Sequence, residues 1–150
     1  MSIKIGFVVS EFNNDITSKM LEHAKKHAKS LRVDVKYICY VPGTFDMPLM
    51  IEKLLRKRNI DAVVTLGAII KGETKHDEII ANTVARLIAD LSLRYSKPVT
   101  FGISGPDMTK SQARDRINAV SMRAVTTAVR MTSRIKQLRL VKTTNITVIK

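Results

Sequence analysis

Apolar, β-branched segments alternate with amphipathic segments along this chain, and that alternation restricts the possible fold more than any other feature. Four segments are predicted to be strands, at residues 3–9, 33–41, 61–70 and 99–103. Their near-continuous hydrophobicity is typical of strands buried on both faces of a parallel sheet. Strands that alternate with helices pair in parallel through right-handed crossovers. We therefore predict an α/β fold, a three-layer sandwich with helices on both faces of a four-stranded sheet.

Helix signals follow each predicted strand. Any residue from Asn13 to Asp15 could cap the first helix, and Pro48 suits the first turn of a helix that runs to about residue 58. Thr109 and Gln112 form the Thr-x-x-Gln pattern of a capping box, so one long helix is predicted from there to about residue 138. Residues 141–150 are open to two interpretations, an added strand or a frayed end.

The size and composition of the chain indicate one globular domain. Its 150 residues are 45% hydrophobic and 26% charged, which excludes a disordered chain. We expect a single domain over residues 1–150, with a basic tail at about 140–150. No apolar run approaches the roughly 20 residues of a membrane helix and no leader pattern is found, so a soluble, cytoplasmic protein is expected. The single cysteine, Cys39, excludes an internal disulfide and a cysteine-based zinc site.

A formal charge of +13 favours anionic partners. The stretch after Asp115 has no acidic residue, and Arg116, Arg123 and Arg130 recur every seven residues within it. This row has three interpretations: a solvated helix face, a nucleic-acid stripe, or anion ligands. A basic nucleic-acid-binding α/β domain is one alternative function, but only 5% of residues are aromatic and no nucleic-acid-binding motif is found.

Ligands of parallel α/β folds bind beyond the carboxyl ends of the strands, which directs attention to the loops at 10–15, 41–46, 69–76 and 102–107. Phe12 is either an exposed stacking platform for a planar ring or a residue that folds back onto the first helix. Phe45 stands between Thr44 and Asp46, whose carboxylate either accepts ligand hydroxyls or caps the following helix.

The third of these loops combines an anion site with a titratable ring. Gly72, Glu73 and Thr74 precede a predicted helix, where free backbone amides favour an anion. His76 has two interpretations: it acts as a general acid or base, or it is a helix-start residue without a catalytic role. His76 and Asp77 are adjacent in the sequence and do not offer three convergent ligands to a metal ion, so no metal site is predicted. The glycine motifs of dinucleotide, triphosphate and serine-hydrolase sites are missing from the sequence.

Four motifs, taken in chain order, resemble those of the 6,7-dimethyl-8-ribityllumazine synthase family, in the style of its archaeal members. They are Glu11-Phe12-Asn13 and segments 41–48 (VPGTFDMP), 66–76 (LGAIIKGETKH) and 98–102 (PVTFG). The resemblance covers about residues 4 to 135. It implies a flavodoxin-like sandwich and a transferase of riboflavin biosynthesis that needs no cofactor or metal. The implied reaction condenses 5-amino-6-(D-ribitylamino)uracil with 3,4-dihydroxy-2-butanone 4-phosphate, releasing phosphate and water.

The resemblance also implies a role for each matching residue. His76 is expected to move protons, and the expected phosphate ligands are Gly72, Glu73, Thr74, Arg116 and Arg123. The expected ligands of the ribitylaminouracil are Phe12, Thr44, Phe45, Asp46, Ala68, Ile69, Ile70 and Phe101, with Phe101 supplied by a neighbouring subunit. The family forms homopentamers, many of them assembled into icosahedral shells of 60 subunits. The chain lacks the insertion near Val120 that pentamer-only members carry, so a shell is compatible with it.

Some positions depart from the family pattern. Asp46 stands where glutamate is usual, and Glu73 replaces a small residue. The family's Gly-Asn-Lys-Gly segment is replaced by residues 120–123 (VSMR), which leaves Arg123 as the candidate for the second phosphate-binding cation. Two other functions remain as alternatives, an archaeal-type riboflavin synthase and a flavodoxin-like electron carrier. The loop from Gly72 to His76 favours the lumazine synthase.

Overall fold

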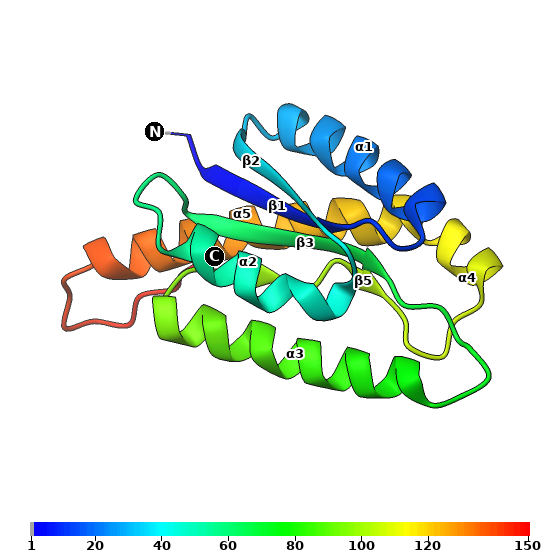
Figure 1. Ribbon diagram of the computed structural model, residues 1–150. Coiled ribbons are helices and arrows are strands. Elements are labelled where there is room, and N and C mark those ends of the chain that lie inside the picture. Colours follow the sequence, from blue (N-terminus) through cyan, green and yellow to red (C-terminus); the bar gives the residue numbers. More distant parts are fainter. Residues whose placement is uncertain (1) are drawn as a thin grey trace.

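The structure is a computed structural model that describes residues 2–150, and it has the predicted α/β architecture with a parallel sheet (Figure 1). The strands are β1 (Lys4–Ser10), β2 (Asp34–Val41), β3 (Ala62–Ala68), β4 (Val99–Thr100) and β5 (Ile103–Ser104). Their order is β2-β1-β3-β4, and β5 also pairs with β3. The helices are α1 (Asn14–Ser30), α2 (Met47–Leu55), α3 (His76–Tyr95), α4 (Lys110–Asp115) and α5 (Ile117–Leu140), with a 3-10 turn η1 (Thr44–Asp46) before α2.

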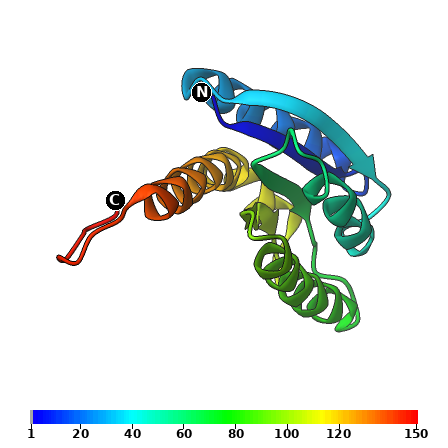
Figure 2. The same ribbon diagram turned by 90° about the vertical axis from the view of Figure 1, so that its left-hand side faces the viewer.

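Helices cover both faces of the sheet, as predicted (Figures 1 and 2). α1 and α5 pack on one face, over a core that contains Phe7, Ile16 and Met20. α2 and α3 pack on the other, over a second core that contains Val8, Ile51 and Val84. Each fully buried aliphatic or aromatic side chain of this size contributes roughly 1.5–3 kcal/mol, so the two cores hold the three layers together.

The last predicted strand, residues 99–103, is two short strands rather than one, which gives the sheet five strands instead of four. β4 and β5 are separated by Phe101 and Gly102, yet the pairing with β3 keeps its register: Val63 pairs with Val99, and Gly67 pairs with Ile103. The interruption therefore comes from hydrogen bonding and not from an inserted residue. The Gly102 N–H donates to the Thr65 side chain at 3.1 Å, which takes it out of the main-chain ladder.

The predicted long helix after Thr109 is also interrupted. The capping box is confirmed: the Gln112 N–H donates to Thr109 Oγ1 at 3.2 Å, and the Thr109 N–H donates to Gln112 Oε1 at 2.9 Å. The helix stops at Asp115 and resumes at Ile117, because the Arg116 N–H bonds back three residues to the Ala113 carbonyl. Residues 141–150 form no strand, and Figure 2 shows this tail extending away from the sheet beyond α5.

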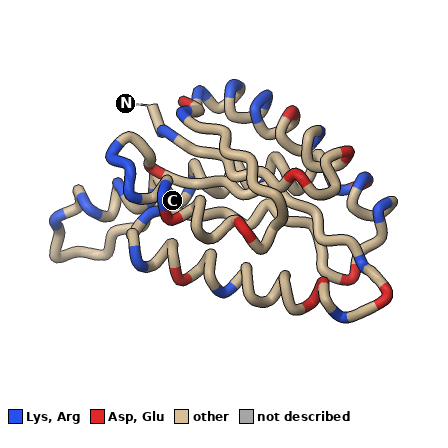
Figure 3. The backbone as a smooth tube through the Cα atoms, in the orientation of Figure 1, with Lys and Arg blue, Asp and Glu red and all other residues tan. Residues whose placement is uncertain are grey.

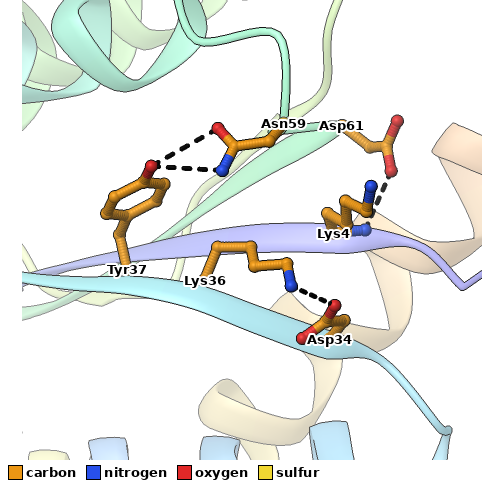
Figure 4. Close-up of polar contacts among 6 residues, drawn as sticks. All are labelled: Lys4, Asp34, Lys36, Tyr37, Asn59 and Asp61. Carbon is orange, nitrogen blue, oxygen red and sulfur yellow. Dashed lines mark hydrogen bonds and ion pairs between the residues drawn. The ribbon is translucent and has the colours of Figure 1, made fainter.

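Polar contacts fasten the amino ends of the strands (Figure 4). The Lys4 N–H donates to the Asp61 carboxylate at 2.8 Å, and the Asp61 N–H returns a bond to the Lys4 carbonyl at 2.7 Å. Tyr37 and Asn59 form a second link, and Lys36 pairs with Asp34 on β2. Lys and Arg residues are spread over α1, the loop after α2 and the far end of α5 (Figure 3). None of the helices within residues 2–150 has the length and hydrophobicity to cross a membrane.

Candidate functional site

A cavity of about 280 Å³ lies at the carboxyl ends of β1, β2 and β3, where the sequence places the candidate residues. The loops after all three strands contribute to its wall. The lining residues are Phe12, Asn13, Gly43, Thr44, Phe45, Ala68, Ile69, Ile70, Gly72, Thr74, His76, Asp77 and Ile80. The predicted ligands that the structure brings together here are Phe12, Thr44, Phe45, Ala68, Ile69, Ile70, Gly72, Thr74 and His76.

Two phenylalanines stand at this cavity with most of their surface exposed. Phe12 is 72% exposed and Phe45 is 60% exposed. One of the two interpretations, that Phe12 folds back onto the first helix, does not fit a side chain with this much exposed surface. An exposed aromatic ring beside a cavity provides an apolar face on which a planar ligand can stack.

Backbone hydrogen bonds fix the loops after β1 and β2 to each other. The N–H groups of Glu11 and Phe12 donate to the carbonyls of Val41 and Pro42 at 2.8 and 2.9 Å. The Asn13 side-chain amide donates to the Ala68 carbonyl at 3.0 Å and so connects the same loop to the end of β3. Asn13 precedes α1 in a left-handed conformation with φ of 59° and makes no side-chain cap bond. The two loops and the end of β3 thus form one continuous wall.

Two close approaches shape the loop after β2. A Cβ atom at Gly67 would lie 3.1 Å from Thr44 Oγ1, so the glycine lets Thr44 pack close against β3. The Asp46 carboxylate accepts a hydrogen bond from the Gly43 N–H at 2.9 Å. This bond closes the 3-10 turn η1, whereas the Asp46 side chain makes no cap bond to α2, the helix that follows. Asp46 does not line the cavity.

A hydrogen bond and an ion pair connect the loop that leads to His76 with the loop after β5. The Lys71 N–H donates to the Met108 carbonyl at 2.9 Å, and the Lys71 ammonium pairs with the Asp107 carboxylate at 2.8 Å. The Lys71 ammonium lowers the pKa of the Asp107 carboxyl, and Asp107 raises the pKa of Lys71. His76 itself is exposed at the first position of α3. Its main-chain N–H donates to Thr74 Oγ1 at 3.4 Å. The imidazole is therefore free to meet a ligand.

The cavity wall contains four residues that the sequence interpretation did not select as ligands: Asn13, Gly43, Asp77 and Ile80. Asp77 is the most informative, since a carboxylate that is only 7% exposed at a helix start is unusual. Its position directly after His76 was the available signal. Asn13 could have been found because asparagine tolerates the left-handed conformation better than most residues.

Four other predicted ligands do not line this cavity. Phe101 and Arg123 line a separate groove of about 700 Å³ between β4, the end of α3 and α5. Arg116 is exposed at the junction of α4 and α5, and Glu73 is exposed in the loop before α3. None of the cavity-lining residues is lysine or arginine, although the chain as a whole is strongly basic. Within residues 2–150 there is also no cluster of three histidine, cysteine or acidic side chains suited to a metal ion.

Comparison with known proteins identifies the family. The family model of 6,7-dimethyl-8-ribityllumazine synthase matches residues 2–136. The chain belongs to the 6,7-dimethyl-8-ribityllumazine synthase family. The resemblance inferred from the four motifs is thereby confirmed.

Curated lumazine synthases from archaea match nearly the whole chain. The protein named 6,7-dimethyl-8-ribityllumazine synthase from Metallosphaera sedula is 56% identical over 137 residues, 91% of either chain. The one from Sulfolobus acidocaldarius is 54% identical over 149 residues, 97% of this chain and 94% of its own. The one from Methanocaldococcus jannaschii is 54% identical over 138 residues, 92% of this chain and 97% of its own.

Proposed function

We propose that this chain condenses 5-amino-6-(D-ribitylamino)uracil with 3,4-dihydroxy-2-butanone 4-phosphate, giving 6,7-dimethyl-8-ribityllumazine, phosphate and water. The observation that carries the proposal is the single cavity at which Phe12, Thr74 and His76 meet, in a chain 54–56% identical to curated lumazine synthases. The enzyme is a transferase of riboflavin biosynthesis. Its substrates are small molecules, and the cavity lies where parallel α/β folds bind such ligands.

The pyrimidinedione ring is proposed to lie between the exposed phenylalanines and the end of β3. Phe12 supplies a flat apolar face, and Phe45 lines the same cavity. Ala68, Ile69 and Ile70 line the cavity at the end of β3 and are proposed to contact the edge of the ring. Thr44 and Asp46 are proposed to reach the ribityl hydroxyls, which for Asp46 requires release of the Gly43 amide.

The phosphate is proposed to bind at the start of α3. The first turn of a helix has backbone N–H groups without intrahelical partners, and the helix dipole favours an anion there. Gly72 and Thr74 line the cavity directly before that turn. A Cβ at Gly72 would meet nothing within 4 Å, so the backbone here is open to a ligand.

His76 is proposed to move protons between the two substrates. Imine formation, loss of phosphate and ring closure each transfer protons, and an imidazole suits such transfers near neutral pH. Holding the two substrates side by side supplies a further part of the acceleration. For this role His76 must stand beside both substrates in the cavity.

The charge of the cavity formed by one chain supports a site that is shared between subunits. Its wall offers a phosphate dianion no cationic side chain. We infer that Phe101, Arg116 and Arg123 of a neighbouring subunit complete it, in a homopentamer that can assemble further into a shell of 60 subunits. In that arrangement the arginines supply the charge that the cavity lacks.

The reaction is tested by mixing the purified protein with both substrates and following the fluorescence of the lumazine. The wild type is expected to raise the rate well above the uncatalysed reaction. His76→Ala is expected to slow it without abolishing it, because substrate positioning remains. Absence of any rate above background from folded protein would exclude the proposed activity and favour the nucleic-acid alternative.

The shared site is tested by mixing two defective variants. His76→Ala and Phe101→Ala subunits, unfolded and reassembled together in equal amounts, give about one quarter of sites without either defect if the two residues come from different subunits. Activity of the mixture should then exceed the mean of the two variants assembled separately. If both residues act within one subunit, no intact site forms and the mixture will show only that mean.

A further inference from the structure

Thr65 is the one polar residue within β3, whose sequence is otherwise apolar or glycine (AVVTLGA). It is completely buried, and its hydroxyl makes two hydrogen bonds to the neighbouring strand segment. Thr65 Oγ1 donates to the Thr100 carbonyl at 2.7 Å and accepts from the Gly102 N–H at 3.1 Å. The hydroxyl thus spans the two residues on either side of Phe101.

These two bonds replace part of a regular ladder. With the register found on both sides of the interruption, Thr65 would face Phe101, and the Gly102 N–H would donate to the Thr65 carbonyl. It donates to the hydroxyl instead. Gly102 comes so close to β3 that a Cβ atom on it would lie 2.0 Å from the Thr65 carbonyl oxygen. The hydroxyl and the glycine together account for the separation of β4 from β5.

The interruption changes the environment of Phe101. Alternation along a continuous strand would place Phe101 on the same face as Val99 and Ile103, both of which pack in the core beneath α3. Phe101 is instead 37% exposed and lines the groove that also contains Arg123 of α5. A large apolar ring is therefore presented at the edge of the sheet.

We propose that Thr65 is a positioning residue: its hydroxyl interrupts the strand so that Phe101 faces outward to contact substrate bound to a neighbouring subunit. The inference rests on the proposed function, in which Phe101 completes the neighbour's cavity. Thr65 never touches substrate, and acts only through the backbone on either side of Phe101.

Three matched variants test the inference. Thr65→Val keeps the shape of the side chain and removes the hydroxyl, whereas Thr65→Ser keeps the hydroxyl. Thr132→Val is the control, because Thr132 is also buried but its hydroxyl has no hydrogen-bond partner within residues 2–150. For Thr65→Val we expect the KM for ribitylaminouracil to rise about tenfold, with little change in the KM for the butanone phosphate. Thr65→Ser and Thr132→Val should stay within about twofold of the wild type.

Amide hydrogen exchange provides a measurement that does not depend on activity. The Gly102 amide should exchange faster in Thr65→Val than in the wild type or in Thr65→Ser, since its acceptor is removed. Unchanged exchange at Gly102 together with an unchanged KM in Thr65→Val would overturn the inference. If Thr65→Val fails to fold, Thr65→Ala compared with Thr65→Ser isolates the hydroxyl in the same way.

The exchange measurement also separates this inference from the proposed function. A wild-type protein that makes no lumazine would refute the proposed function and, with it, the role of Phe101 in binding. Faster exchange at Gly102 in Thr65→Val would still support the part of the inference that concerns the strand. Normal wild-type activity with an unaltered KM in Thr65→Val would instead refute the positioning role alone.

Discussion

The Asp77 carboxylate accepts a hydrogen bond from the Asp107 N–H at 3.1 Å and thereby joins the first turn of α3 to the loop after β5. Asp107 in turn pairs with Lys71, so the loop between Lys71 and His76 is fastened at both ends. Asp77 also lines the cavity. One buried carboxylate therefore links the position of His76 to a loop from a distant part of the chain.

Removal of this link should affect both stability and turnover. Asp77→Ala leaves the Asp107 N–H without its partner, and we expect the free energy of unfolding to fall by about 1–3 kcal/mol. We also expect kcat to fall several-fold because His76 is held less firmly. Asp77→Asn keeps an acceptor oxygen and should lose less. Urea denaturation and steady-state kinetics measure the two effects.

Glu78→Ala is the control for Asp77→Ala. Glu78 is an exposed acid in the same first turn, so both variants lose the same favourable interaction with the helix dipole. Equal losses of stability and of kcat in the two variants would show that the bond to Asp107 contributes nothing specific.

Two glycines near the proposed substrate ligands should respond differently to a methyl group. A Cβ at Gly102 would lie 2.0 Å from the Thr65 carbonyl oxygen and 3.0 Å from the Ala124 Cβ, both within the packed interior. We expect Gly102→Ala to cost roughly 3 kcal/mol or more, or to prevent folding. A Cβ at Gly72 would have no neighbour within 4 Å. We therefore expect the Gly72→Ala variant to be as stable as the wild type but to bind phosphate more weakly. Similar urea midpoints for the two variants would contradict this account.

Glu52 predicts a dependence of stability on pH. Its carboxylate accepts hydrogen bonds from Arg56 at 2.8 Å and from the Tyr95 hydroxyl at 2.7 Å, and these, Arg56 first, lower its pKa. A carboxyl with a lowered pKa binds fewer protons in the folded state than in the unfolded state. Its stabilisation is therefore present above the unfolded pKa of about 4.3 and is lost as the pH falls through the folded value.

The Glu52→Gln variant tests this dependence. Urea midpoints measured from about pH 6 to pH 3 should fall less steeply in the variant than in the wild type. Arg56→Met should flatten the profile in the same direction, because it removes the largest cause of the shift. Parallel profiles for the wild type and both variants would show that the Glu52 contacts do not contribute in solution.

The layers of the fold and most of the cavity were predictable because their signals are local. Buried β-branched runs mark strands, and the Thr109 capping box marks a helix start in any context. The loops after β1, β2 and β3 converge because parallel strands end at one edge of the sheet. Phe12, Thr44 and His76 therefore meet although they are far apart in the sequence.

The remaining features depend on contacts between distant residues. The interruption between β4 and β5 depends on a hydroxyl whose hydrogen-bond partners lie 35 and 37 residues further along the chain, and a threonine within a strand is no signal by itself. The break at Arg116 falls in a segment whose apolar stripe continues on both sides. The separation of Phe101 and Arg123 from the cavity depends on where α5 packs, which their spacing in the sequence does not encode.

The register between β3 and the β4–β5 segment is the same before and after the interruption, and this has an evolutionary consequence. A bulge made by an inserted residue can be removed only by a deletion, which a point substitution cannot achieve. Here Val63 with Val99 and Gly67 with Ile103 keep one register, so nothing needs to be deleted to make the strand continuous. Under the proposed role of Thr65, the outward-facing aromatic at this sheet edge can therefore be lost in a single substitution at Thr65, with every other strand and helix left at its original length.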